Sequence, residues 1–180
     1  MPVAKKDFDI QFSGLKVGEH RFDYQYDSAF FLLFDYRDEA LKEAQFEATV
    51  FFTKNENALQ LSFEIRGKAL VSCDLSGEPF ELPLQNQADL QVKFGDAFDD
   101  TNDEVLILPE GEHSLNVGQF LYELSVLSLP LKKVHPKYQD EEKAAEFLER
   151  MQGQQASDSD SEEQTDPRWN KLKELLNGDN

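Results

Sequence analysis

Few residues of this chain are of the types that perform nucleophilic, acid–base or metal chemistry. The single cysteine is Cys73, and the three histidines are His20, His113 and His135, each isolated in the sequence. One cysteine excludes an intramolecular disulfide and a cysteine-rich zinc site. No serine or cysteine stands in a recognisable nucleophile motif, and the nine glycines are too scattered for a phosphate-binding loop. These residues give catalysis little support, although a triad assembled in space would escape a reading of the sequence.

Cys73 has two interpretations. Lys68 and Arg66 are near it in sequence and could lower the pKa of its thiol, which would make it reactive. Alternatively it is a small apolar side chain on a strand, and free cysteines are commonly buried. We favour the buried interpretation.

An acidic stretch at residues 96–104 suggests a calcium loop at first sight. It lacks the glycine at the sixth position and the bidentate glutamate at the twelfth that an EF-hand loop uses. A solvated loop is therefore the preferred interpretation, and we predict no metal site, no cofactor and no catalytic residues.

The charge of the chain excludes two classes of ligand. Its 180 residues include 18 Lys and Arg against 36 Asp and Glu, a formal net charge of −18. Direct binding to naked nucleic acid is not expected, because phosphate binding depends on positive charge that displaces counterions. An anionic membrane surface is equally unfavourable. The acidity is shared by both parts of the chain, with −12 up to residue 135 and −6 after it.

Large apolar side chains nevertheless predict a folded core. The chain has fifteen Phe, five Tyr and one Trp, too many for a disordered acidic tail. The longest uninterrupted apolar run is six residues, 29–34, against the ~20 that a membrane helix needs. The first residues reach acids before any hydrophobic stretch, so we expect no secretory signal and a cytoplasmic setting.

The elements that must position these residues are mostly strands. Apolar and polar residues alternate along much of residues 8–94, which is typical of strands with one buried face. Residues 46–54 and 58–66 are predicted to form an antiparallel hairpin, and 104–108 a further short strand. Because Pro83 lacks an N–H, its strand should lie at an edge or break there.

Two helices interrupt the strand pattern. Asp27 and Ser28 can cap a short apolar helix that ends at Phe34, although a buried strand is the competing interpretation. A second helix is predicted over 116–128, where Phe120, Leu121, Leu124 and Leu127 have helical spacing. The predicted fold class is α+β: mainly antiparallel β-sheet or open barrel with a few helices, and a partly disordered acidic C-terminal tail ending in a short helix.

The domain organisation follows a change of composition near residue 135. We predict a β-rich domain over 1–135, an amphipathic helix over 136–152 and a disordered acidic linker over 153–165. A docking helix over 166–180 follows, with Trp169 and Leu172 on its apolar stripe. It docks either on its own domain or on a partner.

Three stretches together resemble the YceD-like family, the large-ribosomal-RNA-subunit accumulation proteins. Residues 67–80 resemble its strand, Cys-x-x-Cys turn and Pro-Phe; residues 115–130 resemble its helix ending in Leu-Pro; residues 166–175 resemble its Asp-Pro-Arg-Trp-x-x-Leu ending. Ser76 stands where the second cysteine of the turn would be, and the cysteines that many relatives carry after the Leu-Pro are missing. Any metal role in relatives is therefore not carried over.

The resemblance implies support of 23S ribosomal RNA accumulation and large-subunit assembly. Because the chain is acidic, we expect a non-enzymatic factor that reaches RNA through a basic ribosomal protein or a pre-50S particle. The candidate contact residues are Glu78, Glu81, Asp99, Asp100, Asp166, Arg168, Trp169 and Leu172. The alternative is an acidic nucleic-acid mimic that occupies the basic cleft of an RNA-processing enzyme. An enzyme would need clustered acid–base residues that the sequence does not display.

Overall fold

The computed structural model describes residues 3–36, 39–102, 104–140, 143–147 and 149. The chain divides into two units, residues 1–135 and residues 136–180, and each is described by itself. In the second unit, a 3-10 turn Pro136–Tyr138 comes first, and residues 143–147 and 149 are helical. The rings of Tyr138 and Phe147 contact each other with centroids 4.7 Å apart. The predicted linker over 153–165 and docking helix over 166–180 lie outside the described residues.

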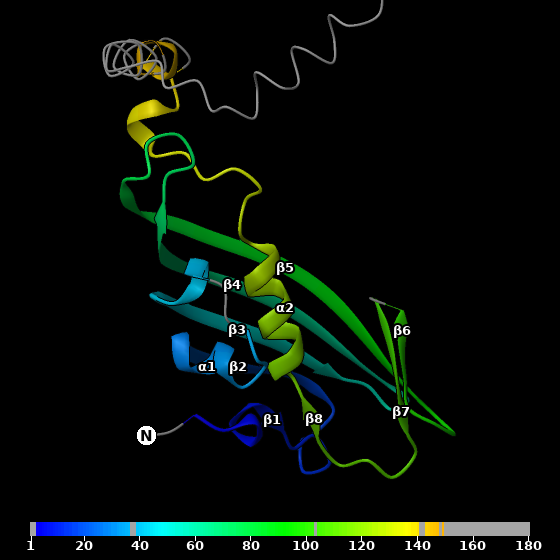
Figure 1. Ribbon diagram of the computed structural model, residues 1–180. Helices are drawn as coiled ribbons and strands as arrows, with labels where there is room; N and C mark the ends of the chain where they lie inside the picture. Colours follow the sequence, from blue (N-terminus) through cyan, green and yellow to red (C-terminus); the bar gives the residue numbers. More distant parts are fainter. Residues whose placement is uncertain (1–2, 37–38, 103, 141–142, 148, 150–180) are drawn as a thin grey trace, which may run out of the picture. The chain divides into compact units, whose positions relative to one another are not determined.

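The first unit is built on a six-stranded sheet (Figure 1). Its strand order is β2-β3-β4-β5-β7-β6, and neighbours are antiparallel except for the parallel pair β5–β7. The strands are β2 Gly18–Asp27, β3 Ala44–Lys54, β4 Ala58–Ser72, β5 Pro79–Gly95, β6 Asp99–Asn102 and β7 Val105–Pro109. The sheet is open, which confirms the predicted fold class.

The predicted hairpin is the centre of this sheet. β3 and β4 pair from Ala44↔Ala69 to Lys54↔Leu59, and the Asn55 N–H closes the turn on the carbonyl of Ala58 at 2.9 Å. Alternate residues of both strands are buried, as the period of two predicts. The buried side chains include Phe46, Val50, Phe52, Leu61, Phe63 and Ile65.

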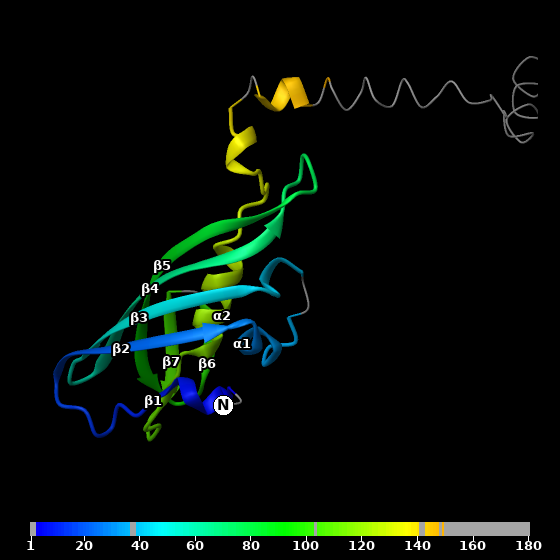
Figure 2. The ribbon, with the colours of Figure 1, turned by 90° about the vertical axis from the view of Figure 1, so that its left-hand side faces the viewer.

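Both α-helices of this unit lie on the buried face of the sheet (Figures 1 and 2). The first, α1, is Ser28–Leu32, and Asp27 caps it by accepting a hydrogen bond from the Ala29 N–H at 2.9 Å. The second, α2, is Gly118–Leu127. Both predicted helices are confirmed. Two 3-10 turns, Lys5–Phe8 and Glu39–Leu41, and a small ribbon of β1 Asp9–Ile10 and β8 Leu115–Asn116 complete the covering layer.

Aromatic side chains fill the space between this layer and the sheet. Phe30 and Phe31 of α1 are fully buried, and their rings contact those of Tyr26 and Phe46 on the sheet. The ring of Tyr122 on α2 stacks on that of Phe34 with centroids 4.7 Å apart. The aromatic residues that composition assigned to a core therefore join α1, α2 and the sheet.

The prediction that the strand lies at an edge or breaks at Pro83 is confirmed in its first form: β5 pairs with Lys68 of β4 there, while β7 reaches only Gln91–Gly95, so Pro83 lies on a locally open edge within the described structure. One expectation about this region needs correction. The stretch 96–104 is not simply a loop, because Asp99–Asn102 forms β6, which pairs with β7. In the part of the chain that is described, no helix is long and apolar enough to span a membrane.

Candidate partner-binding groove

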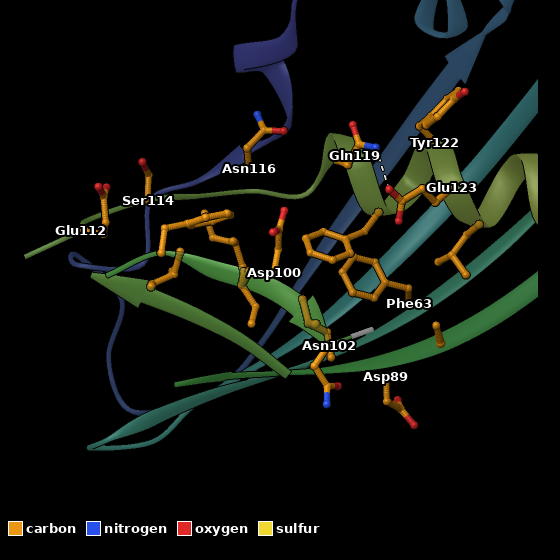
Figure 3. Close-up of a pocket in the computed structure, with 18 of the residues that line it drawn as sticks. Phe63, Asp89, Asp100, Asn102, Glu112, Ser114, Asn116, Gln119, Tyr122 and Glu123 are labelled. Atoms are coloured by element: carbon orange, nitrogen blue, oxygen red, sulfur yellow. Dashed lines mark hydrogen bonds between the residues drawn. The ribbon is translucent and has the colours of Figure 1, made fainter. Parts of the chain in front are cut away.

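A groove of about 830 Å³ separates α2 from the end of the sheet formed by β5, β7 and β6 (Figure 3). Its floor is apolar and comes from both sides, with residues of α2 facing residues of β4, β5, β6 and β7. The apolar lining includes Phe63, Leu90, Leu106, Leu108, Leu115, Phe120 and Leu124. A concave apolar surface of this size is of the kind that binds ligands or partner side chains.

The α2 wall of the groove is fixed by contacts with the sheet. The Asn86 side-chain amide of β5 donates to the carbonyl of Leu124 at 3.1 Å, and the ring of Phe120 stacks near Phe63 with centroids 5.8 Å apart. The Ser125 hydroxyl, itself buried, hydrogen-bonds Tyr26 at 2.8 Å and donates to the Leu121 carbonyl at 2.7 Å. These contacts hold the helix at a set position over the strands.

The opposite wall is the β6–β7 hairpin. Its turn is closed by Asn102, whose side-chain oxygen accepts from the N–H groups of Glu104 and Val105 at 2.9 and 3.1 Å. Asp99 accepts from the N–H and hydroxyl of Thr101, which lower the pKa of its carboxyl group. Every residue of β6 is exposed, so this wall presents its carboxyl groups to water.

Three carboxylates surround the apolar floor. Asp100 comes from β6, Glu112 from the segment between β7 and β8, and Glu123 from α2, where it accepts a hydrogen bond from the Gln119 side chain at 2.6 Å. All three are exposed. Asp89 also lines the groove but is turned away from its floor in Figure 3 and accepts from Ser62 at 2.6 Å. Among the described residues that line the groove there is no Lys, Arg or His.

Two large apolar side chains of the lining are open to solvent. Phe98 is 56% exposed and Leu127 is 73% exposed. Exposed apolar side chains beside a groove often mark an interaction surface. The helical stripe predicted from the sequence placed Leu127 with Leu121 and Leu124; those two are buried, whereas Leu127 is not.

The structure separates the predicted contact residues. Asp100 lines the groove and Asp99 adjoins it on β6. Glu78 and Glu81 lie at the other end of β5, where Glu81 pairs with Lys68 at 2.8 Å. Ala88 is the first groove residue of β5 and lies seven positions after Glu81. In an extended strand, seven positions span about 23 Å. Asp166, Arg168, Trp169 and Leu172 lie outside the described residues.

Sequence reasoning missed Glu112, Glu123, Phe98 and Leu127. Each is unremarkable in its own segment, because acids are frequent throughout the chain. One available signal was the width of the apolar face of α2. Phe120, Leu121, Leu124 and Leu127 form a face wider than packing against the sheet alone would bury. The other was Phe98, an aromatic residue inside an otherwise acidic stretch.

Cys73 is buried at 3% exposure, one residue beyond the end of β4. Burial opposes ionisation of its thiol, but hydrogen bonds from the His135 N–H, from the Ser76 hydroxyl and N–H, and from the Leu75 N–H outweigh burial and lower its pKa to about 7. The cause is thus hydrogen bonds from His135 and from the turn at Leu75 and Ser76, whereas the sequence suggested Lys68 and Arg66. Within the described residues, no three His, Cys, Asp or Glu side chains meet as metal ligands.

Fold and groove together define an α+β protein with an open sheet, helices on one face and a groove with an apolar floor and an acidic rim. Residues 61–176 match the family described as "Large ribosomal RNA subunit accumulation protein YceD", and the chain belongs to this family. The match includes β4 to β7, α2 and all three stretches on which the resemblance was based, so that prediction is confirmed. No curated protein and no solved structure matches the chain. The family is named for accumulation of large-subunit ribosomal RNA, which assigns the chain to that process.

Proposed function

We propose that this protein is a non-enzymatic factor that supports 23S ribosomal RNA accumulation and large-subunit assembly by binding a basic ribosomal protein, free or in a pre-50S particle. The observation that carries the proposal is the groove, whose rim bears Asp100, Glu112 and Glu123 and whose described lining includes no cation. Family membership supplies the process. The negative charge of the groove indicates that the partner is positively charged.

Electrostatics favours a protein partner over RNA. Carboxylates repel phosphates, so a chain of net charge −18 approaches ribosomal RNA most readily through a cationic intermediary. Complementary charge also accelerates encounter and discriminates against acidic competitors. A binding role is further supported by the groove lining, where the described residues place carboxylates without a histidine, cysteine or lysine beside them.

Capture of the partner at two salt concentrations tests this function. Tagged full-length protein is incubated with lysate at low and high NaCl, and the retained proteins are identified by mass spectrometry. We expect a basic large-subunit protein or precursor particle at low salt and less of it at high salt, because exposed charges are screened over ~10 Å at 0.1 M. Recovery of neither at any salt concentration would overturn the proposal.

The nucleic-acid mimic is the second candidate, and the exposed carboxylates of β6 favour it. A mimic would inhibit an RNA-processing nuclease directly, whereas an assembly factor would co-sediment with pre-50S particles in a sucrose gradient. The apolar floor of the groove supports the assembly factor, because a surface that imitates phosphate has no use for exposed Phe98 and Leu127.

A further inference from the structure

We propose that the groove binds one linear, amphipathic segment of the basic ribosomal protein, with apolar side chains on the floor and Lys or Arg side chains on the rim. This inference rests on the proposed function and specifies which part of the partner is bound and where.

The apolar residues require a partner that carries apolar side chains. Phe98 and Leu127 leave 56% and 73% of their surface in water, at the edge of a floor made of Leu106, Leu108 and Phe120. Covering such surface is favourable, because it removes apolar area from water. A polycationic tail without apolar residues would leave this surface wet and forgo that contribution.

The carboxylates require that the same segment be basic. Asp100, Glu112 and Glu123 come from three different elements, so they surround the floor instead of forming one acidic patch. Exposed ion pairs each contribute little to affinity, because water and salt screen them. The rim therefore selects a basic partner and accelerates encounter, while the floor supplies most of the affinity.

The dimensions favour a linear segment. α2 has ten residues, and a helix of that length extends ~15 Å. A groove bounded on one side by α2 and on the other by the short β6–β7 hairpin thus matches a segment of about three helical turns or about five extended residues. A short linear segment can place its side chains along the whole of that distance.

Three sets of variants separate these contributions. The floor variant is Phe98→Ala/Leu127→Ala, and its matched control is Phe51→Ala/Leu70→Ala, two side chains with 41% and 42% exposure outside the groove. The rim variant is Asp100→Asn/Glu112→Gln/Glu123→Gln. Its matched control removes the same charge from exposed acids outside the groove, Glu47→Gln/Glu56→Gln/Glu64→Gln. Each variant is a full-length chain, and thermal unfolding confirms that it folds.

The probe is the total protein of large ribosomal subunits, freed of RNA, and then overlapping synthetic peptides of the protein that wild type captures. We expect one short basic peptide with apolar residues to bind wild type. The floor variant should bind it at least about tenfold more weakly at low and high salt, as loss of a buried anchor does. The rim variant should lose affinity mainly at low salt, and both controls should bind like wild type.

The outcomes distinguish this inference from the proposed function. If wild type captures no large-subunit protein, the proposed function fails. If it captures one and both the floor and the rim variants bind as well as their controls, the groove is not the site, although the function stands. Loss in the rim variant alone would overturn the apolar anchoring and show binding by charge. Binding by the folded ribosomal protein but by none of its peptides would overturn the linear segment. If Phe98→Ala/Leu127→Ala melts at a lower temperature, the two single variants replace it.

Discussion

At the residue scale, Gly67 has the least room for a side chain among the described glycines. It pairs with Phe46 across β3 and β4, and a Cβ atom added to it would lie 2.5 Å from the Gln45 carbonyl oxygen and 2.5 Å from the Phe46 ring. The Phe46 ring is itself buried against Tyr26 and Phe31. Any side chain at this position must displace a strand or an aromatic ring of the core.

We therefore expect Gly67→Ala to lower the free energy of unfolding by about 1–3 kcal/mol, because overpacking a tight site forces such shifts. Urea denaturation followed by circular dichroism measures it. Gly14→Ala is the matched control, since a Cβ there meets nothing within 4 Å, and its effect should stay within about 0.5 kcal/mol. Equal stability of the two variants would show that the Phe46 ring can move without cost.

Cys73 makes stability depend on pH. Its folded-state pKa of about 7 lies below the ordinary value of 9.0, so the folded protein holds the thiolate more favourably than the unfolded chain does. The stabilisation is complete above the unfolded pKa and is lost as the pH falls through the folded pKa. The unfolding free energy of wild type minus that of Cys73→Ala should thus increase between about pH 6 and about pH 9.

Urea denaturation of both proteins under reducing conditions, at several pH values in that interval, measures the difference. The comparison removes contributions from the other titrating groups, which the two proteins share. A difference that does not change with pH would mean that the hydrogen bonds from His135, Ser76 and Leu75 do not favour the thiolate.

At the scale of elements, one polar contact positions α2. The Tyr26 hydroxyl of β2 is 2.8 Å from that of Ser125, and both residues are buried. Burial raises the pKa of Tyr26, so its hydroxyl is protonated and available as a donor. This bond connects the strand at one edge of the sheet to the helix that forms a wall of the groove.

Removal of either hydroxyl should lower the unfolding free energy by about 1 kcal/mol, the usual net contribution of such a bond. We expect Tyr26→Phe and Ser125→Ala together to cost less than the sum of the single changes, because they remove the same interaction. Thermal unfolding of the four proteins of this double-mutant cycle measures the coupling. Strict additivity would show that the two hydroxyls do not stabilise each other.

Elements that depend on residues close together in the sequence were predictable, whereas pairings between segments far apart in the sequence were not. Alternation predicted the β3–β4 hairpin, and the spacing of Phe120, Leu121 and Leu124 before Pro130 predicted α2. The parallel pair β5–β7 was not predicted, because β6 lies between them in sequence within an acidic stretch that favours a loop. Pairing with β7 satisfies backbone N–H and C=O groups of β6. The composition of this stretch does not reveal that pairing.

The candidate site was predictable only in part for the same reason. Asp99 and Asp100 were identified by the density of carboxylates around them. Glu112 and Glu123 join Asp100 only because the chain turns through β7 and β8 before α2 begins. Their nearness is a property of the tertiary structure, and local patterns of type and spacing carry no trace of it.

At the scale of the whole molecule, salt should act on folding and on binding in opposite directions. A net charge of −18 destabilises the compact state by self-repulsion. Screening by NaCl relieves this repulsion, so we expect the melting temperature of the free protein to rise between about 0.05 M and about 0.5 M salt. The same screening weakens attraction to a basic partner, so affinity should fall over this interval.

Thermal unfolding of the free protein and titration of the captured ribosomal protein, in the same buffers, measure the two trends. The rim variant should show a smaller loss of affinity with salt than wild type, while its melting temperature responds almost as strongly. Parallel loss of stability and affinity would mean that salt dissociates the complex by unfolding the protein.

Pro83 has a consequence for how the open edge of the sheet meets other polypeptide chains. Between Pro79 and Leu90, β5 has β4 on one side and no partner strand on the other within the described residues, and an unpaired strand edge is a template on which foreign chains can add. A residue without an N–H in the middle of that edge interrupts the ladder such an addition would need. Pro83 thus makes this open edge of β5 a poor template for the addition of a foreign strand.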